Sequence, residues 1–150
     1  PRWGMKGRGI IYGESDNDMP PTLDGMLVED FVRCEREYRV YCGRRRGCSD
    51  IEILHIDCKI VREGHDGCLI RNARTSRFVS SRNNKVLNGY AVKRQSISAC
   101  EAVGLNLAAV DVGVDAHGNA WVFETNTKPG FDSTPDRQHV RDLWEELRND

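Results

Sequence analysis

The chain has 150 residues, of which 39% are hydrophobic and 30% charged, with a formal net charge of −1. This composition is typical of one domain with a buried core and excludes a wholly disordered chain. No apolar run approaches the ~18 residues of a membrane span, and the near-zero net charge gives no general attraction to nucleic acid or membranes. We therefore expect a cytoplasmic protein that binds neither.

The six cysteines include no Cys-x-x-Cys pair, so their spacing predicts neither a thioredoxin motif nor a zinc ribbon. The one passable metal cluster consists of Cys42, Cys48, His55 and Cys58, at spacings that match no common zinc module. Reduced thiols are the expectation, and a zinc-stabilised interaction domain is the least favoured of the function classes considered.

The first half of the chain reads mostly as strands. A glycine-rich opening at 4–9 comes first, a loop follows at 13–24, and a turn is expected at 63–67. Alternating apolar residues predict strands over 10–12, 26–32, 37–42, 51–61 and 68–70. Residues 76–89 are polar and give no clear prediction.

Helices are expected only in the second half. Ser98 and Glu101 form a capping-box pattern and Gly104 can end a helix, which predicts a helix over 98–103. Near the carboxyl end, Thr134 and Pro135 are typical of a helix start. An apolar stripe at helical spacing follows, formed by Val140, Leu143, Trp144 and Leu147. Strands first and helices later indicate an α+β fold.

Between these helices lies the clearest hairpin, with strands at 109–115 and 120–126. A four-residue loop at 116–119 would put Asp111 directly opposite Glu124, with Asn126 on the same face as Glu124. The other face, expected to be core, carries Val110, Val112, Val114, Trp121 and Phe123.

Two carboxylates facing each other repel, and the hairpin has no obvious cationic partner on that face. A divalent cation would remove the conflict, because Mg²⁺ binds one or two carboxylates and completes its shell with other oxygens. An exposed face with an incidental acidic pair stays open as the alternative.

The glycine-rich opening is a candidate anion site. Gly4, Gly7 and Gly9 would let backbone N–H groups approach an anion, with Lys6 and Arg8 adding charge. The segment lacks the Gly-Lys-Ser/Thr of a P-loop, and the strand expected after it differs from the helix of a dinucleotide fingerprint. An ordinary flexible turn is the alternative.

Asp111 together with the run Glu-Thr-Asn-Thr-Lys-Pro-Gly at 124–130 resembles the metal-binding end of the ATP-grasp superfamily. In that family an acidic residue on one strand is followed by Glu-x-Asn-x-x-Pro-Gly on the next. Residues 102–111 are similar to the family's helix-Gly-Leu run that ends in Val-Asp. Further upstream, the segments that resemble the phosphate lid, the adenine hinge and the strand after it are 7–10, 27–32 and 37–41.

The resemblance implies a metal site and a catalytic pair. Asp111, Glu124 and Asn126 would hold one or two Mg²⁺ or Mn²⁺ ions that bridge the ATP phosphates. Arg71 would stabilise the phosphoryl group in transfer, with help from Asn72, since an Arg-Asn pair occurs there in ligases that modify peptide or amino-acid carboxylates.

It also implies a nucleotide site. The residues concerned are Lys6, Gly7 and Gly9 over the phosphates, Glu29 and Phe31 at adenine, Glu37 at the ribose and Lys59 in the same pocket. Arg39 is a weaker candidate for that pocket. Phosphoryl transfer depends mainly on positioning and charge neutralisation, which suits this set.

The implied fold is an ATP-grasp-type antiparallel sheet lobe with flanking helices. Residues 1–24 would form the phosphate lid and loop, and residues 25–150 the C-terminal ATP- and metal-binding lobe. The family's N-terminal lobe, and the lysine before the glycine loop, have no counterpart here. We therefore expect a fragment of a longer enzyme or a degenerate copy, and a homo-oligomer is also open.

The implied function is an ATP- and Mg²⁺-dependent carboxylate–amine or carboxylate–thiol ligase that acts through an acyl phosphate. Its partners would be ATP, a carboxylate and an amine or other nucleophile. Ala109 stands where some members carry arginine, which favours the peptide or amino-acid ligase branch over D-alanine–D-alanine ligases. A nucleotide-binding module without independent catalysis is the main alternative.

Overall fold

The computed structural model describes residues 11–15, 18, 22, 28–65, 75–81, 85–127 and 138–148. The chain divides into two compact units, one formed by Pro1–Arg33 with Val61–Arg77 and the other by Cys34–Ile60 with Phe78–Asp150. Within the described ranges, neither helix is long and apolar enough to cross a membrane.

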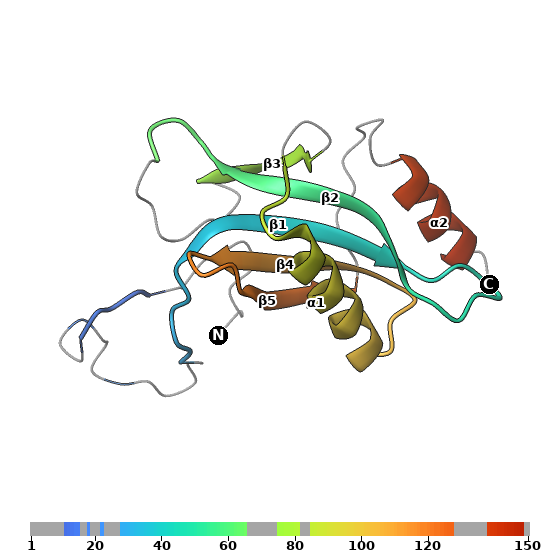
Figure 1. The fold of residues 1–150 in the computed structure, drawn as a ribbon, viewed down its shortest axis with the longest axis horizontal. Coiled ribbons are helices and arrows are strands. Elements are labelled where there is room, and N and C mark those ends of the chain that lie inside the picture. The colour runs from blue at the N-terminus through green and yellow to red at the C-terminus, as the bar shows by residue number, and fades with distance from the viewer. Residues whose placement is uncertain are drawn as a thin grey trace. The chain divides into compact units, whose positions relative to one another are not determined.

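The described elements are β1 (Cys34–Gly43), β2 (Glu52–Val61), β3 (Ser76–Ser80), α1 (Gly89–Ala102), β4 (Leu107–Asp115), β5 (Ala120–Asn126) and α2 (Gln138–Arg148). The strands form one sheet in the order β3-β2-β1-β4-β5, as Figure 1 shows. Strand β1 pairs antiparallel with both β2 and β4, and β4 pairs antiparallel with β5. The expected α+β class, an antiparallel sheet with flanking helices, is confirmed.

The main core lies between one face of this sheet and α1, which crosses the strands in Figure 1. Alternate residues of β1 and β4 point into it, because successive side chains of a strand leave on opposite faces. The fully buried members from the two strands and α1 are Tyr38, Val40, Cys42, Val92, Cys100, Ala108, Val110, Val112 and Val114. Burial of these apolar side chains is what fixes the sheet against the helix.

Helix α1 begins at Gly89, well before the expected start at Ser98. Its N-cap is Asn88, whose side chain accepts a hydrogen bond from the Ala91 amide at 3.4 Å. The Tyr38 hydroxyl in turn accepts a hydrogen bond from the Leu87 amide at 2.8 Å. Only Val92, Ser96 and Cys100 of the helix are buried, and one of these three is a serine, so apolar residues mark the helical period poorly. The expected end is confirmed, with Gly104 at a φ of 68°.

Two expected strands are wrong in their described parts. Residues 11–12 and 28–32 lie outside any strand, and β1 starts only at Cys34, where pairing with β4 begins. Residues 76–89, for which no clear prediction was possible, contain β3 and the start of α1. The strand expected at 68–70 and the helix-start residues Thr134 and Pro135 lie outside the described residues.

A second, smaller core lies on the opposite face of the sheet, formed by Tyr41, Ala109 and Val140 with Leu54 packed against them. Val140 belongs to α2, whose expected apolar stripe is confirmed with Val140 and Leu143 buried. Leu143 can pack against β1 because residue 43 is glycine: a Cβ at Gly43 would lie 2.5 Å from Leu143 Cδ2 and clash with it. This face therefore combines an apolar end beneath α2 with the polar residues described below.

Candidate functional site

The hairpin of β4 and β5 brings the expected acidic pair together. Asp111 and Glu124 are paired across the two strands, and Asn126, two residues farther along β5, is opposite Ala109. Directly opposed residues share a face of the sheet. The sequence-based register is confirmed at this position, and the three oxygen-bearing side chains lie on one face.

The register shifts by one residue just beyond this pair, so that Val112 is opposite Val122 and Gly113 is opposite Trp121. Phe123 is the extra residue of this β-bulge, and a bulge interrupts the alternation of side chains.

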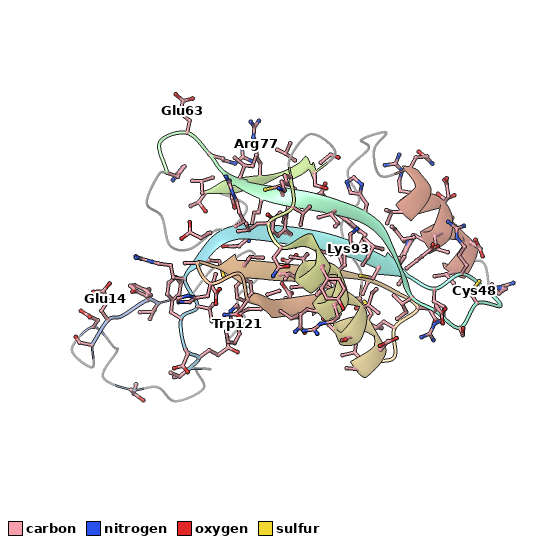
Figure 2. All side chains as sticks on the ribbon, viewed as in Figure 1. Glu14, Cys48, Glu63, Arg77, Lys93 and Trp121 are labelled. Carbon is pink, nitrogen blue, oxygen red and sulfur yellow. The ribbon has the colours of Figure 1, made fainter. Side chains whose placement is uncertain are left out.

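The expectation that Trp121 and Phe123 belong to the core is therefore wrong: their exposed fractions are 45% and 48%. The Phe123 ring lies over Gly113, where a Cβ would approach its Cζ to 2.6 Å. Trp121, labelled in Figure 2, donates from Nε1 to Asp115 Oδ2 at 3.0 Å. Both aromatic rings thus share the face of Asp111.

Asp111 has a cationic partner that the hairpin alone does not reveal. Arg39 of β1 is its neighbour across the β1–β4 pairing. The guanidinium donates from Nε to Oδ1 at 2.7 Å and from Nη2 to Oδ2 at 2.8 Å. The expectation of an acidic pair without a nearby cation is wrong, because the partner comes from a third strand. Glu124 makes no hydrogen bond or ion pair with the described part of the chain.

The two carboxylates stabilise the charged form of Arg39. Partial burial alone would lower its pKa, but the hydrogen bonds and charge of Asp111 outweigh burial, and Glu124 adds to them. The net result is a pKa above the usual arginine value. Arg39 is therefore a fixed positive charge beside the two carboxylates.

Further charged residues line the same face along β1 and β2. Lys59 donates to Glu37 Oε2 at 3.0 Å, and both side chains are mostly buried. The Phe78 ring of β3 lies under both cations, 4.3 Å from Arg39 Cζ and 5.9 Å from Lys59 Nζ. Cation–π contact of this kind stabilises positive charge on an apolar surface. Glu37 and Lys59, expected in one pocket, are brought together.

A buried pair completes this face at the α2 end. His55 Nε2 lies 2.9 Å from Asp57 Oδ1, with side-chain exposures of 5% and 0%. Asp57 is opposite Arg39 across the β1–β2 pairing. The sequence analysis names His55 only with the cysteines and does not single out Asp57 or Phe78. Period-two alternation places His55, Asp57 and Lys59 on one face, but only the register of β2 against β1 shows which face it is.

These residues fit a hard divalent cation. Among the side chains described above on this face, the carboxylates of Glu37, Asp57, Asp111, Asp115 and Glu124 outnumber the cations of Arg39 and Lys59. The ligand atom of Asn126 would be its amide oxygen, because the buried Nδ2, which has no hydrogen-bond partner among the described residues, is a donor and cannot bind a cation. No cluster of three or more His, Cys, Asp or Glu side chains suited to a metal occurs within the described ranges. An ion held here would need Asn126, water and phosphate oxygens, which is the donor set Mg²⁺ accepts.

The zinc cluster considered from the sequence does not assemble. Cys42 and Cys58 lie in the core beneath α1. His55 lies on the opposite face, since it is paired with Tyr41, which belongs to the second core. Cys48 is exposed in the turn between β1 and β2 (Figure 2). Because these side chains lie on two opposite faces of the sheet and in an exposed turn, they cannot bind one ion.

The remaining expected site residues belong to the other unit or are not described. Glu29 is exposed, and Phe31 is 48% exposed and packs edge-on against Tyr12 at 4.9 Å between ring centroids. The residues outside the described ranges are Lys6, Gly7, Gly9, Arg71 and Asn72.

Comparison with known proteins gives one likeness in sequence and others in fold. No family model matches the chain. A stretch of 42 residues is 56% identical to a D-alanine–D-alanine ligase of Stutzerimonas stutzeri strain A1501, covering 27% of this chain and 13% of that ligase. The match is to a protein of the class that Ala109 led us to disfavour.

The fold is similar to that of N5-carboxyaminoimidazole synthetase from Staphylococcus aureus, solved with ADP. The TM-score is 0.52 at 11% identity, over 77% of this chain and 31% of that one. The corresponding enzyme from Thermotoga maritima gives a TM-score of 0.48 at 13% identity, over 87% of this chain and 35% of that one. This chain thus spans less than a third of the first structure's length. The resemblance to the ATP-grasp superfamily is confirmed by the ligase segment and the S. aureus fold together.

Proposed function

We propose that this relative of the ATP-grasp enzymes is the ATP- and metal-binding part of a carboxylate–amine ligase. The observation that carries the proposal is the direct opposition of Asp111 and Glu124, with Asn126 on the same face. Two carboxylates and an amide oxygen form a ligand set for Mg²⁺, and Mn²⁺ could take its place. When bound, the ion would neutralise charge on the ATP phosphates.

The neighbouring side chains suit the rest of a nucleotide. Arg39 and Lys59 provide positive charge beside the metal ligands. Glu37 accepts a hydrogen bond from Lys59 through Oε2, and its carboxylate can also accept hydrogen bonds from ribose hydroxyls. Arg71 and Asn72 would act on the phosphoryl group in transfer, and Lys6, Gly7 and Gly9 would cover the phosphates. Glu29 and Phe31 would hold the adenine.

In the proposed reaction a substrate carboxylate oxygen attacks the γ-phosphorus of ATP, and the bond to ADP breaks. The acyl phosphate so formed is attacked at its carbonyl carbon by an amine, and inorganic phosphate leaves. A thiol could serve as the nucleophile instead. The protein's contribution is to orient these groups and compensate developing charge, which is where most catalysis of phosphoryl transfer arises.

The alternative is a module that binds nucleotide without independent catalysis. This alternative is favoured by the small share of each relative that the chain matches. The matched stretch makes up 13% of the D-alanine–D-alanine ligase, and the fold match covers 31% of the S. aureus enzyme. Substrate carboxylates and amines could depend on segments of those enzymes that have no counterpart in the match.

Release of ADP separates the two. The chain is incubated with ATP, Mg²⁺ and a panel of amino acids and dipeptides, each supplying both a carboxylate and an amine. A ligase gives ADP and phosphate only when a suitable acid is present and Mg²⁺ is not chelated. Nucleotide binding without acid-dependent ADP release would favour the binding module, and the absence of both would contradict the proposal.

A further inference from the structure

The two carboxylates of the proposed metal site are not equally available. Both oxygens of Asp111 accept hydrogen bonds from Arg39, at 2.7 and 2.8 Å. Glu124, directly opposite, has no such partner among the described residues and is exposed. One half of the site is therefore engaged by a cation of the protein itself, and the other half is open.

An arginine engaged in this way opposes a metal ion. Paired N–H···O bonds to a carboxylate are among the stronger interactions a protein side chain makes. Asp111 keeps further lone pairs, but a doubly charged ion bound to them would lie beside the guanidinium. The side chains of Arg39 and Asp111 are only 21% and 15% exposed, so water screens this repulsion incompletely.

Arg39 also has support that does not depend on Asp111. Its guanidinium lies 4.3 Å from the centre of the Phe78 ring, and Asp57 is opposite it on β2. A guanidinium stacked on an aromatic ring keeps its edge N–H groups available for other acceptors. Arg39 can therefore leave Asp111 for a phosphate oxygen while it remains on Phe78.

We propose that Arg39 is a positioning residue that latches the metal site: it holds Asp111 when no nucleotide is present and releases it to the metal when phosphates draw the guanidinium away. This inference rests on the proposed function, since the phosphates belong to the nucleotide. It predicts that metal and nucleotide bind with positive coupling, each strengthening the other by the same factor.

The test measures Mn²⁺ alone, by electron paramagnetic resonance of the free ion, on the whole chain. Arg39→Gln should bind Mn²⁺ roughly tenfold more tightly than the parent, the factor expected when a charge-assisted hydrogen bond no longer competes. Arg39→Lys keeps the charge but not the paired geometry, so its affinity should lie between the two. Lys59→Gln removes a cation that binds Glu37 on the same face and should change Mn²⁺ affinity far less.

A second titration adds a non-hydrolysable ATP analogue. In the parent the analogue should tighten Mn²⁺ binding, and in Arg39→Gln this coupling should shrink by about the same tenfold factor. Circular dichroism verifies that each variant is folded. If Arg39→Gln is not folded, the comparison is made with Arg39→Lys instead.

The latch is contradicted if the folded Arg39 variants bind Mn²⁺ no more tightly than the parent. It is also contradicted if Arg39→Lys equals the parent while Lys59→Gln equals Arg39→Gln, since charge alone would then account for the effect. Tighter Mn²⁺ binding by Arg39→Gln, with no nucleotide binding by any variant, would overturn the proposed function and leave the competition for Asp111 standing.

Discussion

At the scale of single residues, the central feature is a pair of carboxylates that the fold holds face to face. Asp111 and Glu124 oppose each other across β4 and β5, an arrangement that costs stability unless a cation compensates it. Arg39 compensates Asp111, and Glu124 is left exposed.

Glu124→Ala tests the proposed metal ligand directly. Because the change removes an oxygen donor and relieves repulsion, Mg²⁺-dependent nucleotide binding should weaken by at least about tenfold while the free energy of unfolding stays the same or rises slightly. Calorimetric titration and urea unfolding measure the two quantities. Glu101→Ala, an exposed glutamate of α1, is the control and should bind as the parent does. Unchanged binding by Glu124→Ala would remove Glu124 from the site.

Asp115 shows how one carboxylate organises the hairpin loop. Its oxygens accept hydrogen bonds from Trp121 Nε1, from the Asn119 side chain and from the Asn119 and His117 amides, at 2.9 to 3.0 Å. These hydrogen bonds, chiefly those from the Trp121 and Asn119 side chains, lower the pKa of Asp115 well below its usual range. The bulge is what brings Trp121 to this face.

The lowered pKa of Asp115 makes its contribution to stability pH-dependent. A carboxyl whose pKa is lower in the folded chain stabilises the fold above its unfolded pKa of about 3.9, and this is lost as the pH falls toward the folded value. Asp115→Asn should therefore be less stable than the parent at pH 7, and the gap should narrow below about pH 4. Thermal unfolding from pH 7 to pH 3 measures it. Trp121→Phe should show a smaller gap, and a gap independent of pH would contradict this role.

At the scale of secondary structure elements, β4 is central because its two faces have different tasks. Val110, Val112 and Val114 point into the core beneath α1, while Asp111 and Gly113 point to the polar face. A change on the core side should therefore alter stability without altering the site's ligands.

Val112→Ala should lower the free energy of unfolding by about 2 kcal/mol, because it removes buried methyl groups and leaves a cavity. Val103→Ala, at the end of α1 where the side chain is 56% exposed, should change it by less than about 0.5 kcal/mol. Urea unfolding of the two variants provides the comparison. Equal effects would mean that the core does not lie where β4 meets α1.

The elements also show what the sequence could predict. The β4–β5 hairpin was predictable because its loop is short and local, and the ligase-like motif could be located on it. The bulge at Phe123 was not, since it depends on the space that Gly113 leaves for the ring. The start of α1 was missed because its cap, Asn88, follows a polar stretch and few helix residues are buried.

For the whole molecule, the limit of sequence reasoning is register between distant strands. Arg39 and Asp111 are 72 residues apart in the chain and form a direct ion pair. Alternation shows which residues of β1 share a face but not which face meets the carboxylates of β4. The acidic pair within one hairpin could therefore be predicted. The presence of Arg39 beside it, and the position of Asp57 and Phe78 next to Arg39, could not.

The two compact units of the chain contribute different residues to the proposed site. The proposed metal ligands, together with Glu37 and Lys59, lie in the unit formed by Cys34–Ile60 and Phe78–Asp150. Glu29 and Phe31 lie in the other unit. Metal binding by Asp111, Glu124 and Asn126 would need only the first of these units.

The most direct test of the account is calorimetric titration of this chain with a non-hydrolysable ATP analogue, with and without Mg²⁺. The account predicts saturable binding with Mg²⁺ present and binding at least about tenfold weaker after chelation, because Asp111, Glu124 and Asn126 reach the phosphates through the ion. Binding of equal strength with and without Mg²⁺, or no binding in either condition, would contradict it.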